Sequence, residues 1–301
     1  MPPRYVIFCV DPLNPLAVEP DFAAEAQAAT QAGFSVTTVD HDYLDRQVDT
    51  TAALKRTKFN TPGQVIYRGW MMSVEAYSAL YSTLADKGLF LLTSPEQYAA
   101  CHHAPGSYAP LKELMPETTW LPTTDLDSDD HRRNALGPFG SGPIIIKDWV
   151  KSQAAGYWKE ACFIPDASDD ITVNKVISRF RDLQGDGLVG GIVFKAYVPL
   201  IPTGEPAYEY RAFIVDGKVI GCWPRSEAAK QLSAPPQHVL DYVARNVPSP
   251  FASADFGQDN TGRWWLLEVG DGQVSGLPSL EAAPALYSGL AELAQQHATQ
   301  S

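Results

Sequence analysis

The stretch that decides the fold is PIIIKDWVKSQ, residues 143–153. Its three consecutive isoleucines predict a buried β-strand that ends on Lys147. A lysine at the end of a buried strand is a point positive charge aimed at a phosphate or a carboxylate. Small and hydroxyl residues follow, together with a second lysine, Lys151, and this pattern suits a loop that covers phosphate. Lys151 taken alone fits a solvated surface lysine equally well.

Two later segments carry side chains that suit a nucleotide. Residues 194–198 read FKAYV, an apolar strand end that can bind an adenine through its main chain while Tyr197 or Phe194 packs on the ring. An ordinary core strand is the alternative. Glu209 and Arg211 share one face of a predicted strand, because side chains alternate along a strand. They would bind a ribose and a phosphate, or else form a surface ion pair.

Acidic residues near the C-terminus indicate a metal site. Asp255 and Glu268 fall on two predicted neighbouring antiparallel strands, and Asp271 follows shortly after. Clustered carboxylates repel one another unless a cation lies among them. Magnesium is bound by one or two carboxylates together with substrate phosphates. The sequence therefore predicts a magnesium site on these residues.

The first hundred residues follow a different pattern. Strand and helix signals alternate there, which predicts a parallel, three-layer α/β unit. Ligands bind at the carboxyl ends of such strands, where Arg68 is expected. Residues 106–301 read instead as antiparallel sheet with helices. We therefore expect one domain over residues 1–105 and a second over 106–301, with a hinge near 195–199.

Charge and hydropathy exclude some classes of protein. The 301-residue chain has a formal net charge of −12, which disfavours general nucleic-acid binding. No window approaches the roughly 20 apolar residues that cross a bilayer, and the first apolar run is too short for a signal peptide. We expect a cytoplasmic protein. The GDGLVG at residues 185–190 follows a predicted helix and precedes a strand, the reverse of a dinucleotide-binding motif, so we expect a helix cap and turn.

The order of these motifs resembles the ATP-grasp superfamily, and most closely its clade named for two arginines and one lysine. The resemblance rests on four segments, residues 66–70, 147–152, 209–213 and 268–278. It implies an α/β protein in which an N-terminal three-layer domain precedes an ATP-grasp domain, whose two α+β subdomains sandwich ATP. The superfamily has Glu-x-Asn where this chain has EVG at residues 268–270. Asp271 is the expected replacement, and the number of magnesium ions stays open.

The resemblance also implies a function and a set of site residues. The chain would be an ATP-dependent carboxylate–amine ligase that forms an amide through an acyl phosphate, using ATP and Mg²⁺. Its partners would be small-molecule or peptide substrates. The cofactor-binding residues would be Lys147, Phe194, Lys195, Tyr197, Val198 and Glu209, and the catalytic residues Lys151, Arg211 and Arg225. The metal ligands would be Asp255, Glu268 and Asp271, and the substrate residues Arg68, Gln273 and Ser275.

Alternatives remain at this stage. For Arg68, an interdomain salt bridge is as well supported as a substrate carboxylate. A small-molecule kinase would use the same ATP site without an amine. A non-catalytic ATP sensor is favoured by the absent Asn, but the presence of Lys147, Arg211, Asp255 and Glu268 together counts against it.

Overall fold

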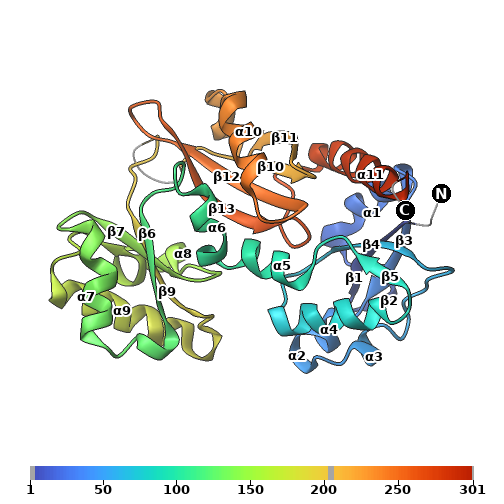
Figure 1. Ribbon diagram of the computed structural model, residues 1–301, viewed down its shortest axis with the longest axis horizontal. Coiled ribbons are helices and arrows are strands. Elements are labelled where there is room, and N and C mark those ends of the chain that lie inside the picture. Colours follow the sequence, from blue (N-terminus) through green and yellow to red (C-terminus); the bar gives the residue numbers. More distant parts are fainter. Residues whose placement is uncertain (1–3, 203–206, 300–301) are drawn as a thin grey trace. The chain divides into compact units, whose positions relative to one another are not determined.

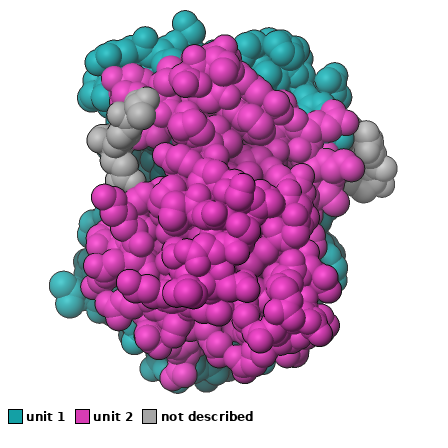
Figure 2. Space-filling model, turned by 90° about the vertical axis from the view of Figure 1, so that its left-hand side faces the viewer, with its two compact units in different colours: residues 1–101, 209–255, 270–301 teal, residues 102–208, 256–269 magenta. Residues whose placement is uncertain are grey.

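The computed structural model describes residues 4–202 and 207–299 and shows a mixed α/β protein (Figure 1). The chain forms two compact units, shown in separate colours in Figure 2. The first unit comprises residues 1–101, 209–255 and 270–301, and the second comprises residues 102–208 and 256–269. These units group segments by packing, so the division predicted at residues 105 and 106 stays a prediction.

A parallel sheet lies at the centre of the first unit, as the alternating pattern predicts. β1 is buried along most of its length and pairs in parallel with β3 on one side and β4 on the other. Both faces are covered by helices, which explains the continuous apolar runs of these strands. The strands are β1 (Arg4–Asp11), β3 (Ser35–Val39), β4 (Gly63–Arg68) and β5 (Leu89–Leu91), with β2 (Asn14–Val18) antiparallel to the end of β1. The helices are α1 (Ala23–Gln31), α2 (His41–Gln47), α3 (Thr50–Ala53), α4 (Val74–Ala85) and α5 (Pro95–His102).

Segments from the C-terminal half complete the core of the first unit. β10 (Glu209–Val215) and β11 (Lys218–Pro224) form a hairpin whose turn, Asp216-Gly217, has both residues at positive φ, as a tight hairpin turn requires. In the sheet order β11-β10-β12-β13, the other strands are β12 (Phe251–Gln258) and β13 (Trp264–Asp271). α10 (Gln237–Asn246) and α11 (Ala283–Thr299) accompany them. Phe213 and Tyr287 belong to the same apolar cluster as Phe8, so distant parts of the chain share one core.

The second unit is built on an antiparallel sheet with the order β6-β9-β7-β8. Ile144, Ile146 and Phe194 share an apolar cluster with residues of helix α9, and Figure 1 shows α7 and α9 beside this sheet. The strands are β6 (Thr118–Pro122), β7 (Ile144–Asp148), β8 (Phe163–Ile164) and β9 (Gly191–Ala196). The helices are α6 (Ala104–Leu111), α7 (Asp129–Leu136), α8 (Ala154–Tyr157) and α9 (Asp170–Gln184), with a π-helical turn at Trp158–Cys162.

Short 3-10 turns connect several of these elements. The turn η5 (Gly185–Gly187) follows α9 and precedes β9, which confirms the interpretation of the glycine-rich GDGLVG as a helix end. The others are η1 (Pro20–Phe22), η2 (Thr123–Asp125), η3 (Gly137–Phe139), η6 (Ala228–Gln231) and η7 (Leu280–Ala282). Among the residues that the structure describes, no helix combines the length and apolarity needed to cross a bilayer.

Candidate functional site

Two lysines project from one face of the sheet in the second unit. In the ladder between β7 and β9, Lys195 pairs with Ile145 and Val193 pairs with Lys147. Because alternate residues share a face, Lys147 and Lys195 lie on the same side. The opposite face carries Ile146 and packs into the apolar cluster with α9. The strand pattern thus sends Ile144 and Ile146 to the core and leaves Ile145 on the other face with the lysines.

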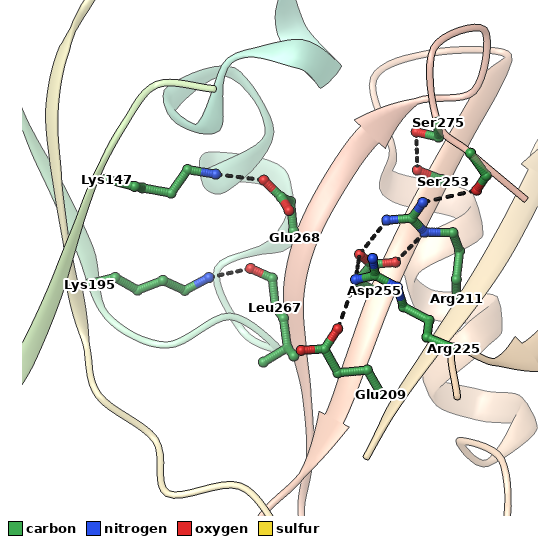
Figure 3. Close-up of polar contacts among 11 residues, drawn as sticks. Lys147, Lys195, Glu209, Arg211, Arg225, Ser253, Asp255, Leu267, Glu268 and Ser275 are labelled. Atoms are coloured by element: carbon green, nitrogen blue, oxygen red, sulfur yellow. Dashed lines mark hydrogen bonds and ion pairs between the residues drawn. The ribbon is translucent and has the colours of Figure 1, made fainter. Parts of the chain in front are cut away.

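Both ammonium groups meet oxygens of residues in the middle of β13 (Figure 3). Lys147 Nζ lies 2.5 Å from Glu268 Oε1, and Lys195 donates to the carbonyl oxygen of Leu267. The Lys195 side chain is buried. Burial, with a smaller contribution from the charge of Lys147, lowers the pKa of Lys195 to about 8. Two ammonium groups on one face of a sheet attract a polyanion such as a triphosphate.

His102 and Lys151 lie near this positive region, and of the two only Lys151 carries a charge at pH 7. Burial, with smaller effects of His103 and Lys147, lowers the pKa of His102 to about 4, so its imidazole is neutral at pH 7. Lys151 is exposed and follows β7 by three residues. No sequence motif marks His102 as part of this region, because its approach to Lys147 depends on packing within the unit.

An aromatic cluster adjoins the lysine-bearing face. Phe163 of β8 pairs with Ile145, so it stands on the same face as Lys195. Its ring stacks on Trp158 with a centroid separation of 5.7 Å and meets Tyr197 edge-on at 5.1 Å. Flat aromatic surfaces of this kind suit a purine base. Phe163 was not predictable from the sequence, because its two-residue strand is too short to show a periodicity.

In the segment of residues 194–198, only one of the two aromatic side chains expected to pack on an adenine is accessible. Phe194 has no exposed surface and packs with the core, so its ring cannot cover an adenine, whereas Tyr197 is 37% exposed. The main-chain N–H of Tyr197 donates to the carbonyl oxygen of Pro143 at 2.9 Å. Among the described residues, the N–H of Val198 makes no such bond. Val198 is therefore the main-chain donor that the segment can offer to a base.

A second charged cluster lies in the first unit (Figure 3). The guanidinium of Arg211 donates two hydrogen bonds of 2.7 Å to the carboxylate of Asp255, and its Nη1 donates to the carbonyl of Gly276. Arg225 contacts Asp255 at 2.9 Å and Glu209 at 2.8 Å. The structure thus brings together a predicted ribose-binding residue, two predicted catalytic arginines and a predicted metal ligand. The paired fork geometry makes the Arg211–Asp255 contact the strongest in the set.

Three acidic residues were predicted to bind magnesium, and they differ in how they fit it. Glu268 is half-exposed, with an oxygen of the hard type that magnesium prefers. Asp255 offers the same chemistry but must give up guanidinium contacts to do so. Among the described residues, no three His, Cys, Asp or Glu side chains form a group able to hold a metal ion. One or two carboxylates suffice when phosphates supply the remaining ligands, so the oxygens of Glu268 and of Asp255, each taken by itself, have chemistry that suits the ion.

Asp271 does not fit that role in this structure. It has no exposed surface, and its Oδ1 accepts from the main-chain N–H and the side-chain amide of Gln273 at 2.9 and 3.1 Å. Its Oδ2 is buried and makes no hydrogen bond with the described part of the chain. Desolvation raises the pKa of Asp271 to about 7. The replacement of the missing Asn by Asp271 therefore has no support from its surroundings.

The predicted substrate residues lie inside the first unit. Arg68 is fully buried and forms a two-bond ion pair with Glu25 at 2.7 and 2.9 Å, and it also donates to the carbonyls of Gly272 and Ser275. Gln273 is likewise buried and bonds to Tyr77. These contacts correct the expectation that Arg68 holds a substrate and favour the alternative of a salt bridge. The salt bridge to Glu25 forms within one unit, whereas an interdomain one was expected.

Ser275 is also engaged within the first unit. Its hydroxyl lies 2.6 Å from the hydroxyl of Ser253 and 2.8 Å from the carbonyl of Asp271. Together with Arg68 and Gln273, these bonds fix the turn that follows β13.

Comparison with known proteins finds a protein family that the chain matches. A family model for an ATP-grasp domain, that of family 3 in the clade named for two arginines and one lysine, matches residues 135–290. No curated protein sequence matches the chain.

Known structures resemble nearly the whole chain. D-cycloserine synthetase DcsG is 14% identical with a TM-score of 0.64 and covers 97% of this chain and 99% of its own. The D-alanine–D-alanine ligase from Coxiella burnetii is 14% identical with a TM-score of 0.57, covering 99% and 97%. The macrocyclase MdnC, bound with precursor peptide MdnA from Microcystis aeruginosa, is 13% identical with a TM-score of 0.57, covering 97% and 99%. At these identities the likeness establishes the fold.

Proposed function

Because the chain belongs to the ATP-grasp domains, in family 3 of the clade named for two arginines and one lysine, we propose that it is an ATP-dependent carboxylate–amine ligase. The observation that carries this proposal is the pair of ammonium groups, Lys147 and Lys195, on one sheet face beside Glu268. The triphosphate of ATP requires such a concentration of positive charge. The adjacent rings of Phe163 and Tyr197 suit the adenine base of the same nucleotide.

The reaction would proceed in two balanced steps. An oxygen of the substrate carboxylate attacks the γ-phosphorus of ATP, the bond from that phosphorus to the bridging oxygen breaks, and an acyl phosphate and ADP result. The nitrogen of an amine then attacks the acyl carbon, inorganic phosphate leaves, and the nitrogen loses a proton. Little covalent work falls to the protein, since holding the reactants and neutralising charge supply most of the rate.

We assign the residues by what their surroundings allow. Lys147, Lys195 and Lys151 would bind phosphate oxygens, and Val198 and Tyr197 would bind the adenine. Glu209 would bind the ribose, and Arg211 and Arg225 would stabilise charge on the transferred phosphoryl group. Asp255 and Glu268 would hold Mg²⁺, which supplies further neutralisation of the phosphates when bound. Arg68, Gln273 and Asp271 would instead maintain the fold.

We also propose a narrower class of substrate than the fold by itself implies. The structures named above include a D-cycloserine synthetase, a D-alanine–D-alanine ligase and a macrocyclase bound with a precursor peptide. We therefore propose an amino acid or a peptide as the source of the carboxylate and the amine. An ATP-using enzyme of this kind would work in the cytoplasm.

The test is nucleotide release by purified protein with Mg²⁺, ATP and pools of amino acids and short peptides. We expect ADP and phosphate only when a carboxylate and an amine are both present. A Glu268→Gln variant should lose this turnover. Glu160→Gln, which changes an exposed carboxylate in the same unit, should retain it.

The alternatives give different results in the same assay. Release of AMP would overturn the acyl-phosphate route. ADP formation with a phosphorylated product and no need of an amine would indicate a small-molecule kinase. Tight binding of Mg-ATP in a thermal-shift titration, without turnover of any pool, would favour an ATP sensor.

A further inference from the structure

Asp148, the last residue of β7, is a carboxylate enclosed by the second unit. It has no exposed surface. Across the described part of the chain, no lysine, arginine or histidine nitrogen comes within ion-pair distance of it. A carboxylate shut away from water is costly unless hydrogen bonds replace its hydration. The position is informative because Asp148 directly follows Lys147 and precedes Lys151 by three residues.

Four N–H groups replace that hydration. Oδ1 accepts from the main-chain N–H of Val150 at 2.6 Å and from that of Lys151. Oδ2 accepts from Gln184 Nε2 at 3.1 Å and from the N–H of Val189 at 3.3 Å. The two oxygens thus face different segments, the turn after β7 on one side and the end of α9 with the approach to β9 on the other.

These bonds close a tight turn. The N–H of Asp148 donates to the carbonyl of Lys151 at 2.9 Å, so residues 148–151 are bonded across the turn through both main chain and side chain. Gln184, which donates to Asp148, also accepts from Gln153 at 3.1 Å and extends the link beyond the turn.

Trp149 anchors the same turn from its other side. Its N–H donates to the carbonyl of Val189, and its own carbonyl accepts from Ala104 at 2.8 Å. A Cβ atom at Gly190 would overlap the Trp149 ring, so the ring and the backbone of the β9 approach are in close contact. The backbone that carries Lys151 therefore has one defined path relative to the end of β7.

We propose that Asp148 is a positioning residue, which fixes the backbone of Lys151 relative to Lys147 so that both ammonium groups meet one polyphosphate. This inference rests on the proposed function. Asp148 itself touches no substrate, because it is buried. A displacement of about 1 Å in a group that positions the reactants can lower the reaction rate up to roughly a hundredfold, and the same displacement would weaken the contact between Lys151 and a phosphate.

The experiment measures the Kd of Mg-ATP by calorimetry for the wild type and three variants. In Asp148→Ala the turn loses both acceptors, and we expect Kd to rise about tenfold or more. Asp148→Asn retains one oxygen able to accept from the N–H groups two and three residues on, but its NH2 group would face the donors Gln184 and Val189, so its Kd should lie between those of Asp148→Ala and the wild type. The matched control is Asp169→Ala, which removes the exposed carboxylate that caps α9 in the same unit and should leave Kd unchanged.

Amide hydrogen exchange supplies a readout without ATP. The N–H groups of Val150 and Lys151 should exchange faster in Asp148→Ala than in the wild type, and slowly in Asp148→Asn. Should Asp148→Ala not fold, Gln184→Ala replaces it. That variant removes one donor to Oδ2 from outside the turn and is expected to weaken Mg-ATP binding to a smaller extent.

The outcomes separate this inference from the function beneath it. Failure of the wild type to bind Mg-ATP would overturn the proposed function and this inference with it. Wild-type binding with an unchanged Kd in Asp148→Ala would overturn the inference alone. Equal weakening in Asp148→Ala, Asp148→Asn and Asp169→Ala would also overturn it, since that pattern reports general loss of stability.

Discussion

Lys195 stands opposite Ile145 in the β7–β9 ladder, and this register places its ammonium on the same face as that of Lys147. The two side chains come from strands that run in opposite directions and are 48 residues apart in the chain. Because like charges so placed repel, the pair is stable only with nearby oxygens, which Glu268 and Leu267 supply. An anionic ligand would relieve the same repulsion.

Removing the charge of Lys147 should weaken nucleotide binding. A hydrogen bond to a charged group contributes about 1.5–3 kcal/mol, so Lys147→Met should raise the Kd of Mg-ATP by roughly tenfold to a hundredfold. Lys175→Met, an exposed lysine on α9, is the control and should bind as the wild type does. Calorimetric titration measures both, and equal affinities would exclude Lys147 from the phosphate site.

The titration of Lys195 should be visible in the stability of the protein. Its pKa is lowered to about 8 in the folded chain, against about 10.4 when unfolded. Below pH 8 both states are protonated and the cost of the buried charge is present in full. Between these values the unfolded state binds more protons, so the free energy of unfolding should rise with pH. Urea unfolding at several pH values should show this rise, relative to Lys195→Met.

Bound Mg-ATP should favour the charged form of Lys195, whereas burial favours the neutral form. An anion beside Lys195 favours the charged form, so binding above pH 8 must take up a proton and should weaken as the pH rises. The Lys195→Met variant should lack this part of the pH dependence. A pH profile shared by wild type and variant would show that Lys195 is not the group responsible.

The buried Arg68–Glu25 pair should matter for stability rather than for substrate binding. Breaking a buried pair by removing one partner costs about 3–5 kcal/mol, because a charge is left unpaired. Arg68→Met and Glu25→Gln should each lower the free energy of unfolding by about that amount, and the double variant by less than their sum. Denaturant unfolding measures all three. A stable Arg68→Met protein that had lost only substrate affinity would contradict this prediction and support a role of Arg68 in substrate binding.

Asp271 should titrate near neutrality. Its pKa is raised by burial to about 7, against about 3.9 in the unfolded chain. Between these values the folded state binds more protons, so the free energy of unfolding should fall as the pH rises from about 4 to about 7. Asp271→Asn, with no group to ionise, should remove that fall and be the more stable protein at pH 8. A loss of magnesium-dependent turnover in this variant at unchanged stability would instead favour the predicted role as a ligand.

Much of the fold was predictable from local patterns. The alternating signals of the first hundred residues predicted a parallel sheet, and β1, β3, β4 and β5 form one. The Ile-rich run predicted a buried strand ending near Lys147, and β7 spans Ile144–Asp148. These features follow from the periodicity and apolarity of single segments, which a sequence displays directly.

Contacts between segments were not predictable in the same way. The ring of Phe163 joins the lysine-bearing face through its pairing with Ile145 in the β7–β8 ladder, and the ring of Phe194 goes to the core through its pairing with Ile146 in the β7–β9 ladder. A shift of one residue in that ladder would exchange the two faces. Neither strand alone fixes the register.

The patterns of apolar, charged and turn-forming residues therefore determined the type and order of the elements, and the order of the lysine, arginine and carboxylate motifs carried the resemblance to the ATP-grasp superfamily. Only the tertiary structure decided which charges have protein partners. Arg68 meets the carbonyl of Gly272, 204 residues away, and Asp271 is enclosed where desolvation raises its pKa. Burial and charge pairing depend on the atoms that packing brings to each side chain, and residues distant in the chain supply most of those atoms.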